Sequence, residues 1–94
     1  MIIRFHMDPE TDLPHIYEHG VTEEEVRQVL RRPGEDFAAR NNSRIAVGQT
    51  SAGRHLQVVY VPDAVPGSVF VVTAFDLTGK ALHAYRRRRR RKSR

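Results

Sequence analysis

Three residues in the middle of the chain have side chains that suit phosphate chemistry. Arg44 and Arg54 lie near the ends of two consecutive apolar stretches, and a guanidinium group binds phosphate through paired hydrogen bonds. His55 follows Arg54 directly, and the ordinary imidazole pKa of about 6.5 suits proton transfer near neutral pH. Lys80 and Tyr85 would add a second cation and a hydroxyl group. These five residues are candidates for a phosphodiester-cleaving cluster, although their spacing alone does not require one. The alternative is that the arginines are solvated strand-edge charges and the tyrosine is part of the core.

A second pattern, His15-x-x-Glu18-His19, matches the H-x-x-E-H string of inverted zinc peptidases. Such a site also needs a third ligand and a deep cleft, and the predicted helix that carries the string is only about two turns long. We therefore expect His19 to close this helix before Gly20, and we predict no metal site and no cofactor.

The net charge of +5 is concentrated at the C-terminal end of the chain. Residues 86–94 hold eight of the 16 lysines and arginines, so residues 1–85 carry 8 basic and 11 acidic side chains, a charge of −3. We expect one domain over residues 1–85 and a basic tail over 86–94. Runs of like charge are usually solvated, but they also bind phosphate polymers by counterion release. The predicted nucleic-acid-binding residues are Arg86, Arg87, Arg88, Arg89, Arg90, Arg91 and Lys92.

Length and composition exclude several classes of protein. The chain has 94 residues and no cysteine, so a single small domain without disulfides or thiolate metal sites is expected. No apolar run approaches the roughly 20 residues of a membrane span, and no signal-peptide core follows Met1. We expect a cytoplasmic protein that does not bind a membrane.

Hydrophobic spacing predicts the elements that must position these groups. Residues 1–7 alternate weakly, as in a strand. A first helix is expected around 12–19, where Leu13, Ile16 and Tyr17 have helical spacing. A second helix follows from Thr22, because Glu25 three residues later completes a capping box.

The rest of the chain alternates with a period of two and then becomes helical again. Strands are predicted over 36–40, 44–50, 55–61 and 68–75, with 51–53 as a hairpin connection, and a helix is predicted from residue 78. The sequence therefore predicts an α+β fold in which two N-terminal helices pack on an antiparallel four-stranded meander, followed by a basic C-terminal helix.

Three strings in this order resemble the BrnT-type toxins and a related small domain family, both of the RelE/ParE-like toxin superfamily. They are His-Gly-Val-Thr at 19–22, Gly-Gln-Thr-Ser-Ala-Gly-Arg at 48–54 after Arg44, and Val-Val-Thr-Ala at 71–74 before a basic final helix. The resemblance covers residues 15–86. The sequence departs from the family pattern in two respects: Phe75 and Asp76 stand where a basic residue is usual, and Ala81 stands where the final helix usually has an acid.

The resemblance implies a compact helix-pair-plus-sheet fold and a metal-independent ribonuclease that arrests translation. It also implies RNA or the ribosome as target and a co-encoded antitoxin as partner. A second hypothesis is a catalytically silent RNA-binding or protein-interaction module with the same fold, since fold and activity are separable.

Overall fold

The computed structural model describes residues 1–92, which form seven strands, two α-helices and two 3₁₀ helices. The strands are β1 (Ile2–Phe5), β2 (Met7–Asp8), β3 (Leu13–Pro14), β4 (Glu35–Ala38), β5 (Arg44–Gln49), β6 (His55–Pro62) and β7 (Ser68–Asp76). The helical segments are η1 (His15–His19), α1 (Glu23–Arg31), η2 (Arg40–Asn42) and α2 (Gly79–Lys92).

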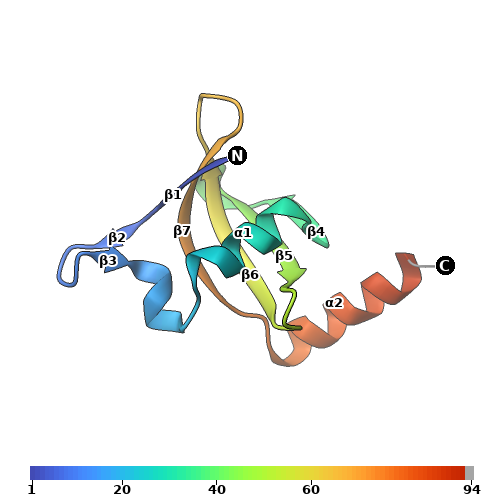
Figure 1. Ribbon diagram of the computed structural model, residues 1–94. Helices are drawn as coiled ribbons and strands as arrows, with labels where there is room; N and C mark the ends of the chain where they lie inside the picture. The colour runs from blue at the N-terminus through green and yellow to red at the C-terminus, as the bar shows by residue number, and fades with distance from the viewer. Residues whose placement is uncertain (93–94) are drawn as a thin grey trace.

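Five of the strands form one mixed sheet in the order β1-β7-β6-β5-β4. The pairs from β4 to β7 are antiparallel, whereas β1 pairs with β7 in parallel. The strands β2 and β3 form a separate small hairpin beside η1 (Figure 1). The tight connection at residues 51–53 sets Gln49 opposite His55 and, five residues away, Arg44 opposite Tyr60.

Helix α1 covers one face of the sheet. Its N-terminus has the predicted capping box, in which Thr22 accepts from the backbone of Glu25 and the Glu25 carboxylate accepts from the backbone of Thr22. These bonds satisfy backbone donors that a helix start leaves open. Val26 and Val29 then pack on the sheet in the larger core. That core consists of Ile16, Val21, Val26, Val29, Ala46, Leu56, Val58, Tyr60, Val71 and Ala74.

Helix α2 packs on the opposite face. Adjacent residues of a strand point to opposite sides of a sheet, and Val47, next to Ala46 of the larger core, belongs to a second cluster with Leu77 and Tyr85. Figure 1 shows α2 leaving the end of β7 and projecting beyond the sheet. The first turns of α2 are therefore held by apolar contacts of Leu82 and Tyr85 with the sheet.

The predicted fold was wrong in two respects. The segment predicted as a first helix contains strand β3 and only five residues of 3₁₀ helix, in which Ile16 is buried while Leu13 and Tyr17 are exposed. Pro14 is extended (φ −55°, ψ 133°), and the helical conformation is disfavoured for the residue before a proline, so the helical segment begins only at His15. The sheet is also five-stranded and mixed, because β1 adds to the edge of β7. The structure is thus a 3₁₀ turn and two separate α-helices on a mixed sheet, and not a helix pair on a four-stranded meander.

The individual elements after residue 20 are confirmed. The helix predicted from Thr22, the four strands between residues 36 and 75, and the helix predicted from residue 78 all appear within one or two residues of their expected limits. The arginine run continues α2 as far as Lys92; Ser93 and Arg94 of the predicted tail lie outside the described residues.

Candidate active site

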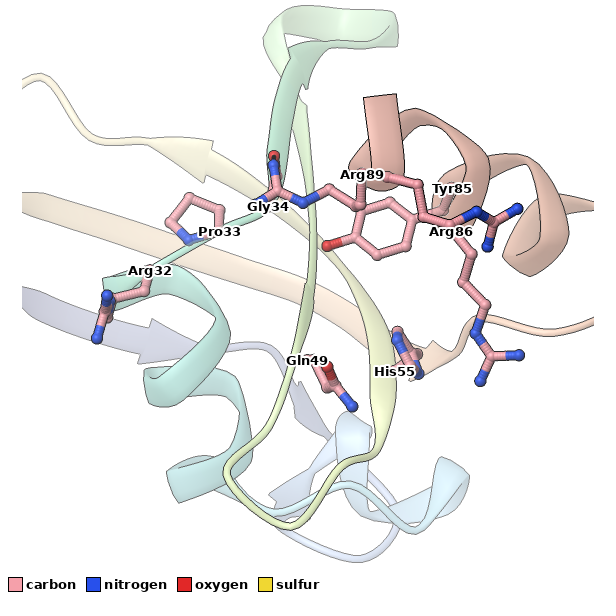
Figure 2. A pocket seen from close by; sticks show the side chains of 9 residues that line it. Arg32, Pro33, Gly34, Gln49, His55, Tyr85, Arg86 and Arg89 are labelled. Carbon is pink, nitrogen blue, oxygen red and sulfur yellow. Dashed lines mark hydrogen bonds between the residues drawn. The ribbon is translucent and has the colours of Figure 1, made fainter. Parts of the chain in front are cut away.

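A hollow of about 640 Å³ opens between the turn after α1, the ends of β5 and β6, and helix α2. Four of the nine side chains that line it are arginines, and none is acidic. Such a concentration of positive charge attracts anionic ligands. The lining residues, shown in Figure 2, are Arg32, Pro33, Gly34, Gln49, His55, Tyr85, Arg86, Arg89 and Arg90.

His55, the first residue of β6, is half-buried in this hollow. Its ring lies edge-on to the ring of Tyr85, with 5.9 Å between ring centroids. Burial lowers the pKa of His55, and the positive charge of Arg86 lowers this pKa further. Because the shift moves the pKa below its ordinary value of 6.5, the imidazole is neutral at pH 7 and is able to accept a proton.

Tyr85 is the buried residue of α2 and extends toward the turn at Pro33 and Gly34 (Figure 2). A Cβ atom at Gly34 would lie 1.9 Å from the Tyr85 hydroxyl oxygen, so only glycine leaves room for this approach. Burial raises the pKa of Tyr85, an effect that nearby Arg89 and Arg88 oppose and Glu35 assists. The phenol is therefore protonated at neutral pH and is able to donate a proton.

Specific hydrogen bonds hold the arginines of α2 beside the sheet. Arg88 donates to both carboxylate oxygens of Glu35 at 2.5 and 2.9 Å, and Arg89 donates to the carbonyl oxygen of Gly34 at 2.9 Å. These bonds connect α2 to the start of β4. Arg86, beside His55 in Figure 2, forms no ion pair with an acidic side chain of residues 1–92. A bound phosphate would give Arg86 an anionic partner.

Arg54, the residue just before His55, is committed to a different set of contacts. Its guanidinium group donates to both carboxylate oxygens of Asp76 at 2.7 and 3.1 Å, to Glu25 at 3.1 Å and to the carbonyl oxygen of Gly20 at 2.7 Å. These bonds join α1 and η1 to the end of β7, and they hold the pKa of Asp76 below its ordinary value. Arg54 does not line the hollow.

The other two predicted residues also lie elsewhere. Arg44 is at the opposite end of β5, where its Nε donates to Asp36 at 2.8 Å, and the Tyr60 hydroxyl donates to the same carboxylate. Lys80 is exposed in the first turn of α2. Of the five predicted catalytic residues, the structure thus brings together His55 and Tyr85 and separates Arg44, Arg54 and Lys80 from them.

Four lining residues were missed from the sequence. They come from a helix end, a turn and a strand end, and are Arg32, Pro33, Gly34 and Gln49. A proline followed by a glycine is typical of a helix end, but only the tertiary structure reveals that this turn faces Tyr85. Gln49 was obtainable in principle, since a tight hairpin at 51–53 places it directly opposite His55.

No protein-family model, curated protein or solved structure matches this chain. The resemblance to BrnT-type toxins accordingly remains a prediction that rests on the quoted strings. Neither α-helix within residues 1–92 has the length and apolar character needed to cross a membrane.

Proposed function

We propose that this protein is a metal-independent ribonuclease whose active site is the hollow around His55 and Tyr85. The observation that carries the proposal is the placement of an imidazole beside a phenol, 5.9 Å apart between ring centroids, in a pocket lined by four arginines and no acid. Burial lowers the pKa of His55 and raises that of Tyr85, which suits the imidazole to accept a proton and the phenol to donate one. A proton acceptor, a proton donor and cations are the groups that RNA cleavage by internal attack requires.

In the proposed reaction, His55 accepts the proton of a ribose 2′-hydroxyl while the 2′ oxygen attacks the adjacent phosphorus. The bond from phosphorus to the 5′ oxygen breaks, and Tyr85 gives its proton to that oxygen. Protonated His55 then returns a proton to the Tyr85 phenolate, directly or through water. The products are a 2′,3′-cyclic phosphate and a 5′-hydroxyl, and Arg86 stabilises the extra negative charge on phosphorus during the transfer.

Substrate binding on this proposal combines the hollow with the exposed arginines of α2. These arginines occupy the part of α2 that follows Tyr85, and this part contains no further aromatic residue. They therefore suit the sugar–phosphate backbone of single-stranded RNA, and base selectivity by stacking on this helix is not expected. Selectivity, where present, would arise in the hollow itself.

The biological role follows from the toxin resemblance and is part of the proposal. A ribonuclease of this kind would act on RNA in the cytoplasm, and an acidic antitoxin would neutralise it by covering the arginines of α2. A small acidic protein encoded beside this chain, and forming a complex with it, would support this role.

The test measures cleavage of a 5′-labelled RNA oligonucleotide in buffer containing EDTA. His55→Gln and Tyr85→Phe are each expected to lower the rate by about 10²–10⁴-fold, while His83→Gln, a substitution of an exposed histidine on α2, leaves the rate unchanged. A 2′-deoxyribose at the cleavage position should block the reaction. Equal rates for wild type and both pocket variants would overturn the assignment of the site.

The ion pairs of Arg54 favour a second candidate, the catalytically silent RNA-binding module. Asp76, one of the departures from the toxin pattern, is the bidentate partner that draws Arg54 away from the hollow. On this reading the wild type binds RNA with the same affinity as His55→Gln, and neither cleaves it. The assay above therefore separates the two candidates directly.

A further inference from the structure

A second cluster of chemically active side chains lies away from the arginine-lined hollow, where the β2–β3 hairpin meets η1. The hairpin pairs Asp8 with Leu13 and so brings the Asp8 side chain beside His15, seven positions later. His15 Nδ1 is 3.1 and 3.3 Å from the two Asp8 carboxylate oxygens and 3.6 Å from Glu18 Oε2. Each of the three residues offers one atom that could bind a metal ion, and these three atoms all lie within 4.8 Å of one another.

These separations fit a single metal ion. Zinc binds imidazole nitrogen and carboxylate oxygen at about 2.0–2.2 Å in tetrahedral geometry, which places neighbouring ligand atoms roughly 3.4 Å apart. The observed distances from His15 to Asp8 and Glu18 bracket that value. Small side-chain rotations are therefore enough to place an ion among the three groups.

The electrostatics of the cluster also favour a cation. Two carboxylates approach one imidazole nitrogen, which carries at most one proton, so hydrogen bonding to His15 alone cannot compensate both charges. Asp8 is largely shielded, with 17% of its side chain exposed. Among residues 1–92, neither Asp8 nor Glu18 forms an ion pair with a lysine or arginine.

Further polar groups surround the cluster. The rings of His6 and His19 lie 5.8 and 5.3 Å from the ring of His15, measured between centroids. A hollow of about 590 Å³ is lined by these three histidines together with Asp8 and part of β7. Thr73 lines the same hollow, and its buried hydroxyl has no hydrogen-bond partner within residues 1–92. The site thus has nitrogen donors and space for a further ligand.

We propose that Asp8, His15 and Glu18 bind one divalent transition-metal ion of the zinc class, with water or a neighbouring imidazole as fourth ligand. The imidazole favours this class over magnesium or calcium, which prefer sites made of oxygen alone. The ion would link η1 to the β2–β3 hairpin and so stabilise the folded chain. This role is separate from the proposed RNA cleavage. The sequence pattern supplied His15 and Glu18; Asp8 is the third ligand that only the hairpin places.

The experiment titrates ZnCl₂ into the full chain after chelator treatment, by calorimetry at pH 7.5 in phosphate-free buffer, and repeats the titration with CoCl₂ by visible absorption. Wild type is expected to bind one ion and to melt roughly 10–20 °C higher at free zinc near 100 times Kd. His15→Gln should weaken binding by more than the roughly 10–100-fold caused by loss of a supporting residue. The control His83→Gln should bind as wild type does.

Glu18→Gln keeps the test decisive if the His15 variant fails to fold, because the Glu18 side chain is 58% exposed and little packing depends on it. This variant should bind zinc at least about tenfold more weakly than wild type. Two outcomes overturn the proposal: wild type takes up no zinc and shows no thermal shift, so that the cluster is an ion pair only, or the His15 and Glu18 variants bind zinc as wild type does.

Discussion

Replacing Arg54 with alanine tests whether this residue holds the fold together or acts on RNA. The substitution removes a bidentate pair with Asp76, an ion pair with Glu25 and a hydrogen bond to the Gly20 carbonyl oxygen. The side chain of Arg54 is 28% exposed, against 22% for Glu25 and 48% for Asp76. Two carboxylates and the backbone carbonyl groups of Gly20 and His19 would lose the guanidinium group that donates to all of them.

The magnitude follows from the environment of each partner. A hydrogen bond to a charged group contributes about 1.5–3 kcal/mol when it is shielded from water, but half-exposed Asp76 regains much of its hydration after the change. Glu25 is better shielded, yet it keeps its capping contacts with Thr22. The net loss is therefore about 2–4 kcal/mol, which in a domain of this size lowers Tm by roughly 10–20 °C.

Thermal unfolding followed by circular dichroism at pH 7 measures the effect, with RNA cleavage assayed well below the lower Tm. Arg44→Ala is the matched control, because Arg44 is more exposed and pairs mainly with Asp36; its expected cost is about 0.5–1 kcal/mol. The reasoning is refuted if Arg54→Ala melts within about 3 °C of wild type. A variant that keeps its Tm and loses cleavage would return Arg54 to the active site.

Three further predictions concern the hollow and its helix. Gly34→Ala places a methyl group against the Tyr85 hydroxyl and should cost about 1–3 kcal/mol by overpacking; an unchanged denaturation midpoint would contradict the contact. Because the pKa of His55 is lowered from 6.5 by burial and then by Arg86, its share of stability is complete above pH 6.5 and is lost as pH falls from there to the folded-state pKa. His55→Gln should remove that slope from a Tm-against-pH series, and the cleavage rate of wild type should begin to fall at a lower pH than an unperturbed histidine would give. Replacing Arg87 and Arg91 with glutamine should reduce the slope of log K against log salt for single-stranded RNA by about 1.4 if both contact phosphates; an unchanged slope would place RNA away from this face.

Local signals predicted most of the elements, and the two failures have different causes, one non-local and one local. The capping box of Thr22 and Glu25 satisfies helix donors within four residues, so it is readable without the rest of the chain. The position of β1 is not readable in this way, since Ile2 pairs with Ser68 across most of the sequence. The spacing of Leu13, Ile16 and Tyr17 misled because the extended conformation at Pro14 takes precedence over the hydrophobic pattern.

The site shows the same division between local and distant information. A hairpin at 51–53 fixes the register, so five residues of strand, or about 17 Å, separate the level of Arg44 from that of His55. A hairpin at residues 51–53 is therefore enough to predict that these two residues lie far apart. The pairing of Arg54 with Asp76 could not be predicted from the sequence, because Asp76 becomes a neighbour of Arg54 only when β7 pairs with β6. Tyr85 reaches His55 only because α2 folds back on the second face of the sheet.

Because α2 packs against the sheet, the first part of the arginine run belongs to the folded domain and is not a free tail. Residues 1–36 carry nine acids and four bases, and one of these acids, Glu35, binds Arg88 with only 13% of its side chain exposed. The first half of the run is therefore attached to the acidic part of the domain, and it forms one wall of the hollow. A truncation after Tyr85 would remove both the arginines that line the hollow and the positive charge of the rest of the helix. A loss of RNA affinity could then not be assigned to one of these two effects. Arg87 and Arg91 are exposed one turn apart and do not line the hollow, so substituting them isolates the charge of the helix from the integrity of the site.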